Sequence, residues 1–361
     1  MLAIVVLCFI TAISLLFFGN YIKKNAAFGL TFLPLAGFVY FLSKLPQITN
    51  GNIVTESYNW VPSLGIQLTF RLDGLSLLFV LLITGIGTLV FAYTSNYLKG
   101  NEHLDRFYGY LSVFMAAMLG LVLSDNLISL FVFWELTSIS SFFLIGFKNS
   151  SATSRKSALR ALTVTGLGGL FLLAGALTFG TIADTYSFQE ILNGSIDFTQ
   201  HPLYSLLLLF IFGAAFTKSA QFPFHFWLPG AMEAPTPVST YLHSATMVKA
   251  GIYLLLRFSP VLGQHEYWQL TLITIGGITM IYAAFHTLFR TDLKGILAYS
   301  TIAALGILVF LIGIGTELAL TAALTFIVVH ALYKATLFLV TGTIDHEAKT
   351  RDVTQLAGLR K

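Results

Sequence analysis

Charged residues are scarce in this chain. Asp, Glu, Lys and Arg make up 10% of its 361 residues, whereas a soluble globular domain carries about 25%. Hydrophobic residues account for 56%. So few charges cannot cover a soluble surface, and the composition therefore predicts a polytopic membrane protein. The 30 glycines agree with this class, because small residues let membrane helices pack closely.

Cysteine and the common cofactor motifs are also lacking. The single Cys8 excludes a disulfide framework and a cysteine metal cluster, and we expect it to be a small buried apolar residue. In "DHEAKT", Thr350 stands where a zinc-protease helix needs its second histidine. We find no Walker loop, no dinucleotide glycine fingerprint after a strand and no haem-type histidine pair. The sequence therefore predicts no cofactor and no metal, and supports neither an ATPase nor a cofactor-bearing redox protein.

Apolar runs of about 20 residues, the length that crosses the hydrocarbon core, recur along nearly the whole chain. The first run has no basic residue before it and no cleavage site after it, so we interpret it as a spanning helix and not as a signal peptide. The long polar connection alternates like a strand and predicts a small external hairpin near 50–72, and "TYSFQEILNG" predicts a short interfacial helix. The eleven predicted spans lie near 2–19, 26–43, 74–97, 107–124, 127–146, 160–183, 203–220, 238–257, 268–288, 293–313 and 318–343.

The basic residues divide unevenly between the connections. The fourteen after odd-numbered spans are Lys23, Lys24, Lys99, Arg106, Lys148, Arg155, Lys156, Arg160, Arg290, Lys294, Lys349, Arg351, Arg360 and Lys361. The three after even-numbered spans are Lys44, Arg71 and Arg257. Cytoplasmic connections carry the lysine and arginine excess, so we expect a multi-pass protein of the cell membrane with its N-terminus outside. The net charge of +4 thus reflects topology and does not point to nucleic acid.

Two ionisable residues, Glu135 and Lys218, lie within the fifth and the seventh predicted spans. Glu135 lies in "LFVFWELTSISSFF", which has no other charge, and a carboxylate there costs about 2.5 to 3.5 kcal/mol unless it faces protein or water. Lys218 lies near the end of "LLLLFIFGAAFTKSAQFPF". Burial disfavours the charged lysine and a nearby carboxylate favours it, so a Glu135 and Lys218 pair would act as a proton switch.

Four more ionisable residues lie in two later spans. His330 and Lys334 are spaced i, i+4 and share one helix face. Lys249 follows His243 by six residues, which places them on different faces. With Glu135 and Lys218, these side chains make a row of proton carriers on at least four spans.

Two prolines interrupt the chain beside Lys218. Pro223 and Pro229 in "SAQFPFHFWLP" free backbone carbonyls that only a cavity lined by water or protein can satisfy. Transporters place ion sites at such broken helices. His225, beside these prolines, is expected to cap a helix or to belong to the loop.

These side chains also have structural interpretations. A lysine near a helix end can extend to the headgroups, as Lys249 could. Glu135 could form an ion pair that holds two helices together, and His243 could be a hydrogen-bonded core histidine. Carboxylates favour helix N-termini, so Glu233 and Asp73 are expected to cap helices.

The segment "TKSAQFPFHFWLPGAMEAPTPVSTYLHSATMVKAGIY", with "FWELTS" before it and "HALYKATLFL" after it, resembles the antiporter-type membrane subunits shared by Mrp cation/proton antiporters and the proton-pumping arm of respiratory complex I. The resemblance covers nearly the whole chain from "FRLDGLSLLFVLL" onward. It is greatest to the large, A-type component of Mrp antiporters, because the complex I counterpart usually has an uncharged residue at Lys249.

The resemblance implies an all-α membrane fold with two inverted five-helix repeats. Residues 1–105 would be N-terminal helices, 106–257 the first repeat, and 258–361 the start of a second repeat that stops after its third helix. A second broken helix with its proton-carrying residue would then be missing, so we expect a truncated fragment. The residues that the resemblance assigns to ion coupling and proton transfer are Glu135, Lys218, Lys249, His243, His330 and Lys334.

The expected function is that of one component of a multi-subunit sodium/proton antiporter, a transporter and not an enzyme, with other membrane subunits as partners. A proton-pumping membrane subunit of an NADH-quinone oxidoreductase complex is the alternative. A third hypothesis is an inert scaffold, which predicts that Lys218→Ala is tolerated.

Overall fold

The protein is a bundle of membrane-crossing helices. The computed structural model describes residues 1–19, 24–61, 66–194 and 196–357. Within these ranges nine helical segments are long and apolar enough to cross a membrane, and two shorter apolar helices, α1 and α9, complete a set that matches the eleven predicted spans. The segments are α1 (Leu2–Phe18), η2 with α2 (Lys24–Thr31, Phe32–Leu42), α4 (Gly74–Tyr97), α5 (Leu104–Leu123), α6 (Leu127–Ile145), α7 (Ala152–Ala183), α9 (Tyr204–Lys218), α11 with α12 (Thr236–Ser244, Met247–Leu262), α13 (Glu266–Thr287), α14 (Leu293–Ile314) and α15 (Glu317–Ala348).

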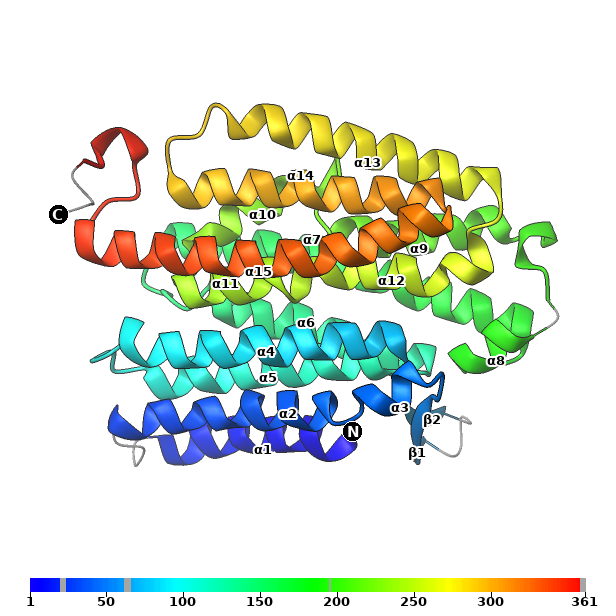
Figure 1. Cartoon of the computed structure of the whole chain (residues 1–361), viewed down its shortest axis with the longest axis horizontal. Helices are drawn as coiled ribbons and strands as arrows, with labels where there is room; N and C mark the ends of the chain where they lie inside the picture. The colour runs from blue at the N-terminus through cyan, green and yellow to red at the C-terminus, as the bar shows by residue number, and fades with distance from the viewer. Residues whose placement is uncertain (20–23, 62–65, 195, 358–361) are drawn as a thin grey trace.

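The helices run side by side along the long axis, so their connections gather at two ends (Figure 1). The connections α4–α5, α6–α7 and α13–α14 lie at the left end in that view, together with the segment after α15. These are the connections with the basic excess, and the predicted alternation is therefore confirmed for the described residues. Three residues of the basic set, Lys23, Arg360 and Lys361, lie outside the described residues.

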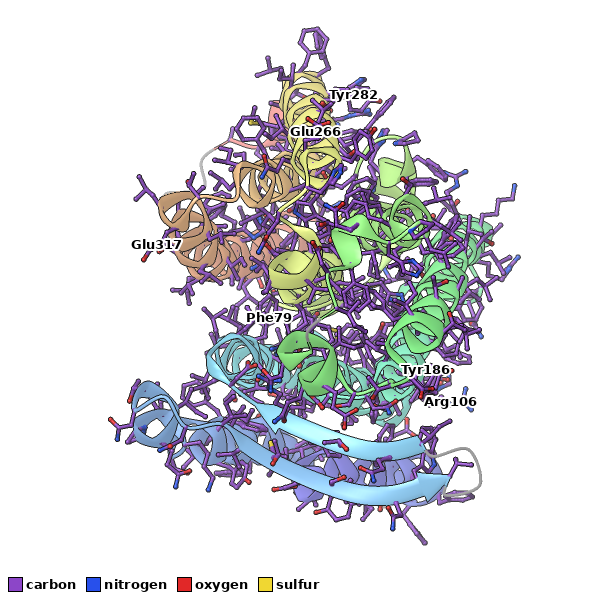
Figure 2. The ribbon with its side chains drawn as sticks, turned by 90° about the vertical axis from the view of Figure 1, so that its right-hand side faces the viewer. Phe79, Arg106, Tyr186, Glu266, Tyr282 and Glu317 are labelled. Atoms are coloured by element: carbon purple, nitrogen blue, oxygen red, sulfur yellow. The ribbon has the colours of Figure 1, made fainter. Side chains whose placement is uncertain are left out.

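The opposite end carries the predicted hairpin and short helices. Strands β1 (Val54–Val61) and β2 (Ile66–Leu72) pair antiparallel, and the turn at 62–65 lies outside the described residues. Figure 2 looks along the helices from this end and shows the hairpin in front of them. The Thr69 carbonyl accepts a hydrogen bond from the Asp125 amide at 2.9 Å, which ties β2 to the α5–α6 connection. Helices α3 (Leu45–Thr49) and α8 (Phe188–Asn193) also lie at this end, and α8 confirms the predicted short helix.

Small residues allow helices α13 and α14 to pack closely. Helices α13 and α14 cross where Gly306 faces α13, and a Cβ atom at this glycine would lie 2.6 Å from the Met280 amide nitrogen. A side chain there would push the helices apart, whereas glycine lets the two backbones approach closely.

Two interruptions divide the middle of the chain. Helix α9 ends at Lys218, and the proline segment continues through η5 (Phe224–Phe226), α10 (Trp227–Gly230) and η6 (Ala231–Glu233) before α11 begins. The Trp227 indole donates to the Thr217 carbonyl at 2.9 Å, so the segment folds back on the end of α9. A span is present where 238–257 was predicted, but it is not one continuous helix, because it breaks between α11 and α12. The Thr246 hydroxyl bonds to the Tyr241 carbonyl at that second break.

Candidate functional site

Lys218 is the last residue of α9 and its side chain is fully buried. Its Nζ donates to Ser138 Oγ at 2.7 Å and to the Trp134 carbonyl at 3.2 Å, both on α6. The ammonium also lies 5.1 Å from the centre of the Trp134 ring, where it gains a cation–π contact. The lysine therefore faces α6 and does not extend to the headgroups.

Glu135 lies on the same helix as these acceptors, but its carboxylate faces α7. A side chain at Gly169 would collide with Glu135 Oε1, so the glycine makes room for the carboxylate. Oε1 is buried and has no hydrogen-bond partner among the described residues. Glu135 and Lys218 are close enough to interact electrostatically, yet the ion pairs found in the described part do not include them. The structure thus brings the predicted pair together without direct contact.

Lys249 continues the row one helix further. It is fully buried on α12, and its Nζ donates to the Ile327 carbonyl of α15 at 2.9 Å. The snorkelling interpretation of Lys249 is therefore wrong, because the ammonium points into the bundle. The Ser219 hydroxyl bonds to the Val248 carbonyl at 2.7 Å. Ser219 follows Lys218 and Val248 precedes Lys249, so this bond connects the end of α9 to α12 beside the two buried lysines.

Helix α15 carries the last part of the row on one face, as the spacing predicted. Lys334 Nζ donates to Ser300 Oγ on α14 at 2.7 Å. His330 is fully buried, and both of its ring nitrogens lack a hydrogen-bond partner in the portion that the structure describes. It interacts electrostatically with both Lys249 and Lys334. The histidine thus stands between two buried lysines.

His243 lies apart from this row, in the last turn of α11. It is fully buried, and neither ring nitrogen has a hydrogen-bond partner among the residues described. The interpretation as a hydrogen-bonded core histidine is therefore wrong. Its ring lies between Trp227 and Phe338, with centroids 6.4 and 6.2 Å away.

Sequence reasoning missed Lys294, which it placed among the residues of a connection. The side chain is 2% exposed, in the first turn of α14, and its Nζ donates to the Ala234 carbonyl at 2.9 Å. It also interacts electrostatically with His243. A signal was present, because a lysine in the first turn opposes the helix dipole and needs acceptors from elsewhere.

A second charged cluster lies at the hairpin end of the bundle. Asp73 caps α4 as predicted, accepting a hydrogen bond from the Ser76 amide at 3.0 Å. Arg257 was expected in a connection, but it lies within α12 and forms a two-pronged ion pair with Asp73. Arg71 Nε lies 3.3 Å from the same carboxylate. Burial raises the pKa of Asp73, but the hydrogen bonds and charge of Arg257 and the bonds from Ser76 outweigh it and lower the pKa to about 2.

The other two structural expectations have different outcomes. Glu233 is exposed in η6, and α11 begins after Pro235 without a side-chain cap, so the predicted capping role of Glu233 is wrong. His225 belongs to η5 in the interrupted segment, as one of the two expectations had it, and makes no capping bond. Its ring packs on Tyr282 with centroids 4.7 Å apart.

Comparison with known families gives two matches that together cover most of the chain. The family described as "NADH:quinone oxidoreductase/Mrp antiporter, TM" matches residues 124–361. The family described as "NADH-Ubiquinone oxidoreductase (complex I), chain 5 N-terminus" matches residues 60–108.

Individual relatives are much longer than this chain. A protein of Staphylococcus haemolyticus, named as the A1 component of a Na(+)/H(+) antiporter, is 46% identical over 340 residues, which are 91% of this chain and 42% of that protein. A protein of Rhizobium meliloti, named as the A/B component of a probable K(+)/H(+) antiporter, is 48% identical over 314 residues, 87% of this chain and 31% of that protein. In the solved Mrp complex from Dietzia sp. DQ12-45-1b, one chain is similar with a TM-score of 0.92 and 41% identity, over 99% of this chain and 39% of that one. The chain thus spans less than half the length of these relatives.

Proposed function

Because this chain belongs to the NADH:quinone oxidoreductase/Mrp antiporter transmembrane family, we propose that it works in a multi-subunit monovalent cation/proton antiporter and carries protons through its bundle. The observation that carries this proposal is the row of ionisable side chains inside the bundle from α6 to α15, in which the lysines and histidines are buried and Glu135 is half-buried. Its members are Glu135, Lys218, Lys249, His330 and Lys334, with His243 and Lys294 beside it.

Each lysine of the row has oxygen acceptors that stabilise its charged form. Ser138 and the Trp134 carbonyl accept from Lys218, and the Ile327 carbonyl accepts from Lys249. A buried ammonium without such acceptors would lose its proton, because burial disfavours the charged form. The glutamate and histidines differ in that Glu135 Oε1 and both nitrogens of His330 have no partner in the described residues. These are the atoms that can take up a proton or a water molecule, so protons would pass between them and the lysines.

Glu135 would set the proton affinity of Lys218. Approach of the carboxylate stabilises the ammonium, and its withdrawal or its attraction by a passing cation favours proton release. In this scheme the cation and the proton are coupled without binding at the same atom. Among the described residues the two charges form no direct ion pair, so the proposed switch could move in either direction.

Sodium is the cation that we propose first, because the Staphylococcus relatives are named for it. The Rhizobium relative is named for potassium, so transport assays should include both ions. The partners would be other membrane subunits of the complex. A quinone-reducing complex is the weaker candidate, because these relatives are named as antiporter components.

We also propose an orientation and a division of the bundle. The end with the basic connections would face the cytoplasm, with the N-terminus outside. One five-helix repeat, from about residue 106 to 257, would consist of α5, α6, α7, α9 and the broken helix α11 with α12. Helix α13 would begin its inverted counterpart. Distance measurements between labels on α5 and α13 in the complex would test this division.

The test of the function is Glu135→Gln in the complete complex, assayed in everted membrane vesicles with a pH-sensitive dye. We expect loss of sodium-driven dequenching, because the amide cannot attract the Lys218 ammonium. Glu266→Gln is the matched control, since this glutamate is exposed at the start of α13. Dequenching that survives in Glu135→Gln, or in Lys218→Ala as a scaffold would allow, would overturn the proposal.

A further inference from the structure

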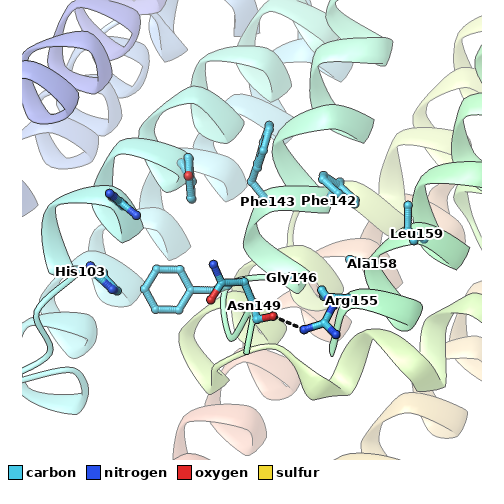
Figure 3. A pocket seen from close by; sticks show the side chains of 11 residues that line it. His103, Phe142, Phe143, Gly146, Asn149, Arg155, Ala158 and Leu159 are labelled. Atoms are coloured by element: carbon cyan, nitrogen blue, oxygen red, sulfur yellow. Dashed lines mark hydrogen bonds between the residues drawn. The ribbon is translucent and has the colours of Figure 1, made fainter. Parts of the chain in front are cut away.

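A cavity of about 360 Å³ opens between α5, α6 and α7 at the end that carries the basic connections (Figure 3). Its volume falls within the range of about 300 to 1,000 Å³ that is usual for small-molecule sites. It belongs neither to the proton row nor to the arginine cluster at the hairpin end. The residues that line it are either basic and polar or aromatic and apolar.

The basic part lies at the helix ends. Arg106 stands in the first turn of α5 and Arg155 in the first turn of α7, and both are exposed. An Arg155 guanidinium nitrogen donates to the Asn149 carbonyl, drawn as a dashed line in Figure 3, which holds this side chain at the cavity. Neither arginine forms an ion pair with a carboxylate among the described residues.

The nearest acidic residue in sequence does not neutralise this part. Asp105 precedes Arg106, but its side chain packs against Gly19, the residue after α1, where a Cβ atom would collide with it. Glu102 lies in the preceding connection and pairs with no basic residue in the part of the chain described. The cavity mouth therefore has two arginines without an ion-pair partner in the described part of the chain, and His103 adds a third group that can donate.

The apolar part lies deeper along the same helices. Tyr110 is one turn beyond Arg106, and its ring stacks on Phe143 with centroids 5.1 Å apart. Phe143 and Leu159 are 44% and 54% exposed. One turn of helix rises about 5.4 Å, so Tyr110 and Leu159 each lie about that far beyond the arginine of their own helix. Tyrosine rings are enriched at membrane interfaces.

We propose that this cavity binds an anionic phospholipid, with the phosphodiester between Arg106 and Arg155 and an acyl chain over Phe143 and Leu159. A guanidinium matches phosphate oxygens in a two-pronged hydrogen bond. Basic pockets between helices on the cytoplasmic side attract anionic headgroups. A protein partner fits less well, because the two arginines would need carboxylates while the apolar part needs a long flexible chain.

The test uses the assembled complex, purified and delipidated in detergent, and native mass spectrometry with added phosphatidylglycerol or phosphatidylcholine. We expect phosphatidylglycerol to bind more tightly, and Arg106→Gln with Arg155→Gln to raise its dissociation constant about tenfold or more, since a charge-assisted hydrogen bond contributes about 1.5 to 3 kcal/mol. The control pair is Lys156→Gln with Arg160→Gln. These two basic residues are exposed on α7 and do not line the cavity.

Two further experiments distinguish binding of a lipid from binding of a free anion: a substitution that fills the apolar part of the cavity, and competition with inorganic phosphate. Leu159→Trp should weaken phosphatidylglycerol binding while the arginines remain, because it blocks the apolar part. Inorganic phosphate at millimolar concentration should displace the lipid only weakly. Equal binding of the two lipids, equal losses in the control pair, or complete displacement by inorganic phosphate would each overturn the proposal.

Discussion

The Glu135 carboxylate lies where Gly169 of α7 has no side chain. Glu135 comes from α6, so a glycine on one helix fixes the place of a charge on the next. The carboxylate therefore depends on the helix contact for its position beside Lys218, in addition to its own rotamer. A substitution that leaves every ionisable residue intact can then test the proposed switch.

Gly169→Ala should reduce cation-driven proton movement in everted vesicles by about tenfold or more, because a misplacement of about 1 Å near the reacting groups can cost that much. The methyl group would overlap Glu135 Oε1 and displace it. Gly166→Ala on the same helix is the control, since its Cβ would meet nothing within 4 Å. Equal activity of the two variants, at equal amounts of protein in the membrane, would show that the carboxylate position does not matter.

Part of this site could be predicted from the sequence for a physical reason. In a chain with 10% charged residues, a glutamate or lysine within an apolar run is conspicuous because its burial is costly. Glu135, Lys218 and Lys249 were found in this way. The pattern of runs also predicted the spans, because the bilayer fixes their length.

Other features could not be predicted, because they depend on contacts between distant segments. Gly169 is one of 30 glycines, and only the approach of α6 distinguishes it. The break after Ser244 has no proline or glycine at that point, so no local signal marks it. Arg257 looked like a residue of a connection until its ion pair with Asp73, 184 residues away in sequence, held it within α12.

Asp73 predicts how stability depends on pH. Its pKa is about 2 in the folded protein and 3.8 ordinarily, so the unfolded chain binds its proton first as the pH falls. The carboxylate therefore stabilises the fold fully above about pH 4, by about 2 kcal/mol, and this contribution is lost as the pH falls to about 2. Thermal unfolding of the purified complex at pH 7, 4 and 2.5 should show this decline in the wild type.

Asp73→Asn should unfold at lower temperature at pH 7 and should lose less of its remaining stability on acidification. The exposed Asp197, which caps only a short 3-10 helix, supplies the control variant Asp197→Asn. A parallel acid decline in Asp73→Asn and in the wild type would mean that other carboxylates cause it.

Variants of Lys294 can show whether this residue matters for its buried contacts or only as a basic residue of its connection. If it serves only as one of the basic residues of its connection, Lys294→Met and Arg290→Met should have the same small effect. Its 2.9 Å bond to the Ala234 carbonyl joins α14 to the segment before α11, near His243. We therefore expect Lys294→Met alone to reduce antiport by about tenfold or more, since it removes a charge-assisted hydrogen bond of about 1.5 to 3 kcal/mol. The vesicle assay with both variants decides between the two roles.

A substitution of Lys249 should affect transport and stability in different ways. The Lys249 ammonium is fully buried and has one acceptor among the described residues, the Ile327 carbonyl at 2.9 Å, so we expect burial of the charge to cost more than this bond contributes. Replacing a buried charge by an apolar side chain of similar volume is often neutral or stabilising by about 1 to 4 kcal/mol. Lys249→Met should therefore keep or raise the unfolding temperature of the complex, while proton movement in vesicles falls to background because methionine carries no proton. A variant that lost stability and activity together would instead identify Lys249 as a structural link between α12 and α15. Lys156→Met, exposed on α7, should change neither quantity. A buried lysine that lowers stability and yet is needed for transport is what a proton-carrying role of Lys249 predicts.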